Sequence, residues 1–148
     1  NPRSWPVDLE KHGYRLPILV EWEHACRGGT TTAYSFGNDS TLLGYYAYFV
    51  ENSDGTYHAV AQKRPNARGL FDIHGNLHEW CQDLHIADNV DFEKDMPTFS
   101  GLRLGQGGCF NSPREYCKSS SSLGFGPAER SFNRGFRLVR SLPGNSSK

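Results

Sequence analysis

The segment from Gly69 to Cys81, GLFDIHGNLHEWC, constrains the fold more than any other part of the chain. Its two carboxylates, Asp72 and Glu79, are separated by the pair Gly75-Asn76. A turn at that pair would bring both carboxylates and the intervening backbone carbonyls around one hard cation, and ligation by oxygen alone suits Ca²⁺. The spacing is not that of an EF-hand, whose ligands come from a loop of about twelve residues. The alternative is a hairpin turn with a solvated Asp72 and a capping Glu79.

The composition predicts a loop-rich globule. The chain has 148 residues, which is enough for one domain, and we expect that domain to span residues 1–148, with a lead-in at 1–13 and a flexible tail at 143–148. Mean hydropathy is −0.63, yet there are 16 glycines and 8 prolines. With 9 Phe, 7 Tyr and 3 Trp, burial must depend on aromatic rings more than on aliphatic helices.

The charge balance excludes two classes of partner. Sixteen basic and sixteen acidic residues cancel, so the chain lacks the electrostatic footprint of a protein that binds nucleic acid or an anionic membrane. No apolar run approaches the roughly 20 residues of a membrane span, and the amino terminus is polar, without a signal-peptide pattern. Cysteines 26, 81, 109 and 117 show no zinc-ligand spacing and are too few to imply a disulfide scaffold. The compartment therefore stays open, with extracellular or periplasmic location among the alternatives.

One helix and a few short strands are expected. Residues 18–27 carry apolar side chains at helical spacing and are closed by Gly28-Gly29, which predicts a helix with Trp22 and Cys26 in the core. Residues 30–60 have no sustained period and read as long loops anchored by aromatic rings. Strands are predicted at 58–60, 102–110 and 131–140, and a solvated acidic loop at 82–100.

A set of short motifs runs through the chain in a fixed order. They are Tyr14-Arg-Leu-Pro17, Glu21-Trp-Glu23, Ala25-Cys-Arg-Gly-Gly29, Asn66-Ala-Arg-Gly-Leu-Phe-Asp72, His74-Gly-Asn76, Glu79-Trp80, Gly107-Gly108 and Gly135-Phe-Arg137. In this order they resemble the formylglycine-generating-enzyme, or sulfatase-modifying-factor, family. The resemblance implies an α+β fold: an irregular, loop-rich variant of the C-type-lectin-like fold with little regular secondary structure and loops rigidified by calcium. Members with the whole fold carry a further amino-terminal portion, so we expect a missing portion or a partner chain.

The resemblance also assigns ligands to a calcium ion. Carried over position by position, the family's calcium site falls on the side chains of Asp72 and Glu79 and on the backbone carbonyls of Gly75 and Leu77. These are the residues that the turn at Gly75-Asn76 brings together. Calcium is accordingly the expected cofactor.

At the positions that hold copper in the family, this sequence differs from the family pattern. Its enzymes oxidise a peptide cysteine to formylglycine with O₂ and copper(I), which is held by two thiolates five positions apart. Cys117 matches the second thiol, but the first falls on Ser112, and a hydroxyl is a poor ligand for soft copper(I). Cys109 falls on the family's active-site serine, Tyr116 matches an active-site tyrosine, and His78 replaces a tryptophan. Cys109 and Cys117 could approach one metal, form a local disulfide or be ordinary small side chains.

Three functions follow from the resemblance. The favoured one is a non-catalytic or atypical, calcium-stabilised lectin-like module that binds a protein, a peptide or another ligand. Its expected contact surface lies in the loop region 110–132, a mix of aromatic and arginine side chains common at interfaces, although these rings could instead be core. The residues are Phe110, Asn111, Arg114, Phe125 and Arg130.

The other two functions are a copper-dependent oxidase and an accessory domain. The oxidase would use Cys117, Tyr116 and Cys109, with Ser112 in place of the lost thiol, and would act in sulfatase maturation. The accessory domain would be one part of a larger bacterial protein, such as a kinase or a secreted enzyme.

Overall fold

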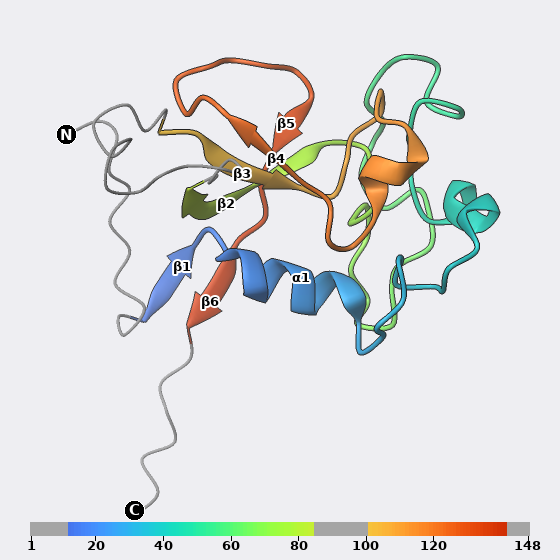
Figure 1. Ribbon diagram of the computed structural model, residues 1–148, viewed down its shortest axis with the longest axis horizontal. Helices are drawn as coiled ribbons and strands as arrows, with labels where there is room; N and C mark the ends of the chain where they lie inside the picture. Colours follow the sequence, from blue (N-terminus) through green and yellow to red (C-terminus); the bar gives the residue numbers. More distant parts are fainter. Residues whose placement is uncertain (1–11, 85–100, 142–148) are drawn as a thin grey trace, which may run out of the picture.

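A computed structural model describes residues 12–84 and 101–141 of the chain (Figure 1). Its elements are β1 (Gly13–Arg15), α1 (Leu19–Arg27), η1 (Ser40–Tyr45), β2 (His78–Leu84), β3 (Arg103–Gln106), η3 (Arg114–Cys117), β4 (Ser122–Phe125), β5 (Arg134–Gly135) and β6 (Val139–Ser141). Most of the described chain lies between these elements, as the α+β, loop-rich expectation requires. No helix within 12–84 or 101–141 is long and apolar enough to cross a membrane.

The predicted helix at 18–27 is confirmed by α1. Glu21 in its first turn accepts a hydrogen bond from the Ile18 backbone N–H at 3.0 Å and pairs with both terminal nitrogens of Arg15 at 2.6 Å. The helix ends at Gly28, whose φ of 60° is the left-handed conformation that favours glycine. Trp22 and Cys26 are buried, as predicted.

A four-stranded sheet in the order β4-β3-β2-β5 forms the centre of the fold, and β1 pairs with β6 in a separate ribbon (Figure 1). The β2–β3 and β3–β4 pairs are antiparallel, whereas β2 and β5 are parallel. Gly105 on β3 has to be glycine, because a Cβ there would lie 2.4 Å from the Phe125 ring. Phe125 can therefore cover the middle of this sheet.

Two hydrophobic clusters make up the core. One joins α1 to the sheet through Trp22, Cys26, Ile73, Cys81 and Leu104, and the other gathers Tyr34, Leu43, Ala47, Phe49 and Cys117 among the loops. His74 lies between the clusters. Its ring contacts Tyr34 at a centroid distance of 5.6 Å, and its Nδ1 lies 2.8 Å from the Cys117 carbonyl oxygen.

Several strand predictions are wrong or need new bounds. Residues 58–60 form no strand, because the Asn76 side chain binds both the N–H and the carbonyl of His58, at 2.9 and 3.1 Å, in place of a neighbouring strand. The strand expected at 102–110 stops at Gln106, where Gly107 and Gly108 turn left-handed.

The closing strand expected at 131–140 is split into β5 and β6, which belong to different sheets. Residues 82–84 complete β2, so the loop predicted at 82–100 begins later than expected, and its remainder at 85–100 lies outside the described residues. Residues 1–11 of the lead-in predicted at 1–13 and the whole tail predicted at 143–148 also lie outside them, and Gly13 begins β1.

Candidate functional site

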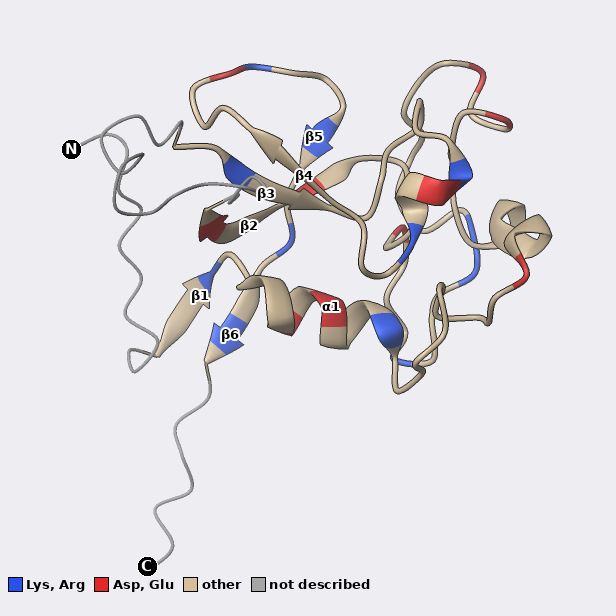
Figure 2. Ribbon diagram, in the orientation of Figure 1, with Lys and Arg blue, Asp and Glu red and all other residues tan. Residues whose placement is uncertain are grey.

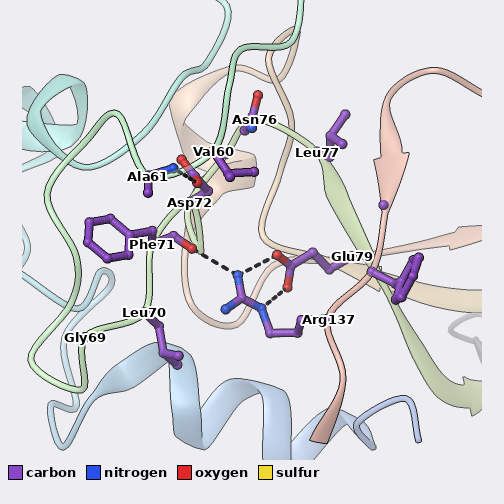
Figure 3. A pocket seen from close by; sticks show the side chains of 13 residues that line it. Val60, Ala61, Gly69, Leu70, Phe71, Asp72, Asn76, Leu77, Glu79 and Arg137 are labelled. Atoms are coloured by element: carbon purple, nitrogen blue, oxygen red, sulfur yellow. Dashed lines mark hydrogen bonds and ion pairs between the residues drawn. The ribbon is translucent and has the colours of Figure 1, made fainter.

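All four residues predicted to bind calcium line one pocket of about 420 Å³. Figure 3 shows Asp72 and Glu79 on opposite sides of it, with Arg137 between them and Phe71 beside it. The outer wall is apolar and open to solvent, since Val60 is 74% and Phe136 65% exposed. The pocket thus combines an apolar rim with a charged interior.

A tight turn brings the two carboxylates to this pocket, as the Gly75-Asn76 pair predicts. The Leu77 N–H donates to the Gly75 carbonyl at 2.9 Å across Asn76, whose φ is 67°. The chain packs so closely here that a Cβ on Gly75 would lie 2.3 Å from the Tyr48 carbonyl oxygen. Only glycine fits at that position.

Asp72 is buried, and one of its two carboxylate oxygens accepts a hydrogen bond. One carboxylate oxygen, Oδ2, accepts a hydrogen bond from the Ala61 N–H at 2.7 Å, while Oδ1 is buried and has no hydrogen-bond partner among residues 12–84 and 101–141. The residue is 8% exposed, so the alternative of a solvated Asp72 is wrong. A buried carboxylate oxygen without a partner is costly, and a bound cation would relieve that cost.

Glu79 is also buried, and three side-chain nitrogens bind it, so the alternative of a capping Glu79 is wrong. The Trp22 indole N–H donates to it at 2.7 Å, and Arg137 donates through Nη2 at 2.6 Å and through Nε. Burial by itself would lower the pKa of Arg137, but the hydrogen bonds and charge of Glu79 outweigh it and hold that pKa above its ordinary value. Arg137 also donates to the Phe71 carbonyl at 3.1 Å (Figure 3).

The donors in the pocket fit a small hard cation. Asp72, Glu79, Gly75 and Leu77 present only oxygen atoms to a cation. Arg137 and Trp22 already bind both Glu79 oxygens, so among the described residues the carboxylate oxygen without a partner is Oδ1 of Asp72. One guanidinium against two carboxylates leaves a net negative charge. Within the described residues, no group of three His, Cys, Asp or Glu side chains forms a metal cluster, so any cation here would also depend on backbone carbonyls.

The predicted catalytic residues gather in a second region, after β3. Ser112 is buried, and its Oγ accepts a hydrogen bond from the Cys109 backbone N–H at 3.0 Å. The Cys109 thiol lies 3.2 Å from the same Oγ and donates to Asn111 Oδ1 at 2.8 Å. Ser112 is therefore held as a hydrogen-bonding hydroxyl within the loop.

Cys117 is a fully buried thiol on η3. It donates to the Pro113 carbonyl, with sulfur and oxygen 3.6 Å apart. Burial, and next the neighbouring Cys109, raise its pKa to about 12. All four cysteines are free thiols, so the disulfide alternative for Cys109 and Cys117 is wrong.

Of the other two residues carried over from the family, Tyr116 lies in the same region and His78 lies on β2. Tyr116 is 47% exposed on η3. His78 is buried on β2, with its ring centroid 5.1 Å from that of Phe125, and burial lowers its pKa to about 4, so it is neutral.

The predicted contact surface is partly exposed. Asn111 and Arg130 are exposed, and Arg114 pairs with Glu51 at the surface. Phe125 is half-buried beneath the Arg134 guanidinium. Phe110, only 2% exposed, stacks on Phe132 at a centroid distance of 5.9 Å, so its ring belongs to the core.

Sequence reasoning missed the residues that support the site. His74 and Arg137 lie in the family motifs His74-Gly-Asn76 and Gly135-Phe-Arg137, but the resemblance gives neither residue a role. Burial lowers the pKa of His74 to about 4. Its neutral ring donates from Nδ1 to Cys117 and accepts at Nε2 from the Ser35 N–H at 3.1 Å. A histidine between two buried backbone groups leaves no periodic signal in a sequence.

Comparisons with known proteins identify the family. The model of the sulfatase-modifying factor enzyme 1-like domain matches residues 4–142. A formylglycine-generating enzyme from Streptomyces coelicolor is 29% identical over 86% of this chain and 46% of its own length. The chaperone protein LppX from Paenibacillus barcinonensis is 30% identical over 93% of this chain and 54% of its own length.

The solved structure of Treponema denticola variable protein 1 has the same fold. It superposes with a TM-score of 0.77 at 37% identity and covers 89% of this chain and 49% of that protein. The chain spans about half the length of the relatives it matches. Because the family model covers nearly the whole sequence, the chain belongs to the sulfatase-modifying factor enzyme 1-like family.

Proposed function

We propose that the chain is a calcium-stabilised ligand-binding module of this family and not a copper-dependent cysteine oxidase. The observation that carries the proposal is Ser112, which stands where the family's copper chemistry requires a thiolate. Its hydroxyl already accepts the Cys109 N–H at 3.0 Å. A neutral hydroxyl cannot replace a thiolate on copper(I), which prefers soft sulfur ligands.

The remaining thiols do not supply an obvious substitute pair. Cys117 keeps its proton at neutral pH, because its pKa is raised to about 12, and it donates that proton to the Pro113 carbonyl. Cys109 likewise uses its proton in a hydrogen bond to Asn111. Copper would have to displace both protons inside a buried site, and this opposes loading.

Calcium binding is the second part of the proposal. The unpartnered Oδ1 of Asp72 supports it, together with the pocket that gathers Gly75, Leu77 and Glu79. A cation there would stabilise the folded turn by mass action, because the unfolded chain lacks the site. The ion would thus be structural.

The ligand surface that we propose lies on the loops after β3. Asn111, Arg130 and Tyr116 are exposed there, and Phe132 is 72% exposed. Exposed aromatic and arginine side chains in one region are characteristic of protein interfaces. A protein or peptide is therefore the proposed partner.

A copper(I) titration tests the proposal. The reduced protein competes with a chromogenic copper(I) chelator, and the Cys117→Ser variant serves as the reference. We expect the two proteins to withdraw the same small amount of copper. Ser112→Cys, which restores two cysteines five positions apart, is the matched gain-of-site variant and is expected to withdraw more copper than either.

One outcome would overturn the proposal. If the unmodified protein binds one equivalent of copper(I) and Cys117→Ser loses it, then the altered thiol set holds the metal and the oxidase becomes the leading function. A repeat with Cys109→Ser would then identify the second sulfur.

A further inference from the structure

Arg134, at the start of β5, is held against aromatic rings on the four-stranded sheet. Its guanidinium carbon lies 4.1 Å from the Phe125 ring centroid and 5.7 Å from that of Trp80. The side chain is 13% exposed. Figure 2 shows basic residues in blue and acidic residues in red at β5 and on the loop between β4 and β5. The rings fix the guanidinium in one orientation.

This guanidinium has few hydrogen-bond acceptors for a charge that is mostly buried. Among the residues that the structure describes, Nη2 pairs with Glu129 Oε2 at 3.1 Å, while Nε and Nη1 are buried without a partner. Buried arginine normally uses its planar fork on a carboxylate through two parallel hydrogen bonds. Each bidentate edge of Arg134, Nε with Nη2 and Nη1 with Nη2, therefore has an acceptor only at Nη2 in the described chain.

His78 adds an acceptor at the same place. It is the strand partner of Arg134, and both side chains pack on Phe125. The ring donates to the Gln106 backbone, so Nδ1 is left as an acceptor, and within the described part of the chain Nδ1 is buried without a partner. Together the two residues need an acceptor for Arg134 and a donor for His78. An acidic residue of a peptide carries both, as a carboxylate and a backbone N–H.

The Glu129 carboxylate already contacts Arg134 in the way that an external carboxylate would. It is 61% exposed at its side chain, and its backbone closes a turn by donating to the Gly126 carbonyl at 3.0 Å. A single contact from an exposed carboxylate contributes little free energy. An external carboxylate that displaced Glu129 from Nη2 and also reached Nε would form the stronger, bidentate pair along that edge of the guanidinium.

We propose that Arg134 and His78 form a binding site for an acidic residue of a protein or peptide partner, and that Glu129 occupies it in the free chain. The proposal rests on the proposed ligand-binding function and names the chemistry of its ligand. Arg130 and Arg134 outnumber Glu129 on this loop, which complements an acidic partner. Phe132, 72% exposed, offers contact to an apolar neighbour of the acidic residue.

The test uses two dipeptide probes that differ only in charge, acetyl-Phe-Glu-amide and acetyl-Phe-Gln-amide, with the full chain. Binding is followed by NMR through the Arg134 Nε–H and the backbone amides of residues 122–135. We expect the glutamate probe to shift these signals and the glutamine probe to leave them unchanged. Glu129→Gln removes the internal competitor and should tighten binding of the glutamate probe about tenfold.

Arg134→Gln should abolish binding of the glutamate probe. Arg140→Gln makes the same charge change on β6 and should not alter it. Free glutarate separates the sources of the carboxylate: binding as tight as that of the glutamate probe would overturn the peptide assignment. If Arg134→Gln does not fold, Glu129→Gln decides alone.

Two further results would overturn the inference, namely equal binding of both dipeptides or no gain from Glu129→Gln. Neither affects the copper titration. Failure of this site is therefore distinguishable from failure of the proposed function.

Discussion

The carboxylate region at Asp72 and Glu79 and the thiol region at Cys109, Ser112 and Cys117 are neighbours with opposite character. The segment 74–76 connects them, because His74 donates to the Cys117 carbonyl at 2.8 Å and the Asn76 carbonyl accepts from the Phe110 N–H at 2.9 Å. The carboxylate region holds two buried carboxylates, one of which, Glu79, is paired with Arg137. The thiol region holds two buried cysteine side chains and a buried hydroxyl, with weak hydrogen bonds at the sulfur atoms.

This difference shows at which part of the site a substitution should destabilise the fold least. Glu79 binds Trp22 of α1 and Arg137 beyond β5, so removing it would affect three parts of the fold. The loop from Cys109 to Ser112 is closed instead by a backbone hydrogen bond of 2.9 Å between these two residues. Because this backbone bond helps to hold position 112, we expect a change of its side chain to lower stability less than a change at Glu79.

The largest effect is expected for Glu79→Ala. The change leaves the Arg137 guanidinium and the Trp22 N–H without their acceptor in a buried site. Removing one partner of a buried ion pair costs about 3–5 kcal/mol of unfolding free energy. Urea denaturation followed by tryptophan fluorescence measures it.

Glu23→Ala is the matched control on α1. Glu23 pairs with Arg27 one helical turn away at the surface, and such a pair contributes about 0.3–0.5 kcal/mol. Equal losses for the two variants would mean that the carboxylate region is no more constrained than the surface, and the comparison would fail.

A smaller effect is expected for calcium through Asp72. At calcium concentrations about one hundred times the dissociation constant, bound ion adds about 2.7 kcal/mol to stability. Chelation should therefore lower the Tm of the unmodified protein. Asp72→Asn should abolish this response, because it removes the charge from the unpartnered oxygen.

The Asp72→Asn variant separates the effect of the ion on stability from the effect of the turn. Asparagine tolerates the φ of 58° at this position, and its carbonyl can accept the Ala61 N–H. Its stability without calcium should thus match that of the chelated parent. If Asp72→Asn still gains stability from calcium, the ion binds elsewhere.

The sequence predicts the helix and the turn because their signals are local. Pro17, Gly28 and the helical spacing of Trp22 and Cys26 define α1 without help from distant residues, and Gly75-Asn76 defines the turn. The family motifs then placed Asp72 and Glu79 together, and both line the same pocket.

The remaining features depend on contacts distant in sequence. No local pattern shows that the Asn76 amide would replace a strand at His58, that Arg137 would bind Glu79, or that Phe110 would turn inward onto Phe132. These contacts join residues 18 to 58 positions apart or lie across a loop. Periodicity reports which residues face a core, and it carries no information about such pairs.

His74, which binds the thiol region through the Cys117 carbonyl, should make the stability of the protein depend on pH. Burial lowers the pKa of His74 to about 4, below the ordinary value of 6.5, so between these pH values the unfolded chain binds more protons than the native chain. Stability must therefore fall as pH falls from about 6.5 towards 4. At pH 5 this one histidine accounts for a loss of about 2 kcal/mol relative to pH 7, and His78, with the same direction of shift, adds to it.

The difference in unfolding free energy between pH 7 and pH 5 tests this, since it removes any packing change that a variant brings at both pH values. His74→Gln should reduce that difference by about 2 kcal/mol, because the group that must be protonated on unfolding is gone. His24→Gln, on the exposed side of α1, should keep it. If both variants keep the full acid-dependent loss, then His74 titrates in the native protein. The neutral hydrogen bond from His74 to Cys117, which joins the two regions, would then be wrong.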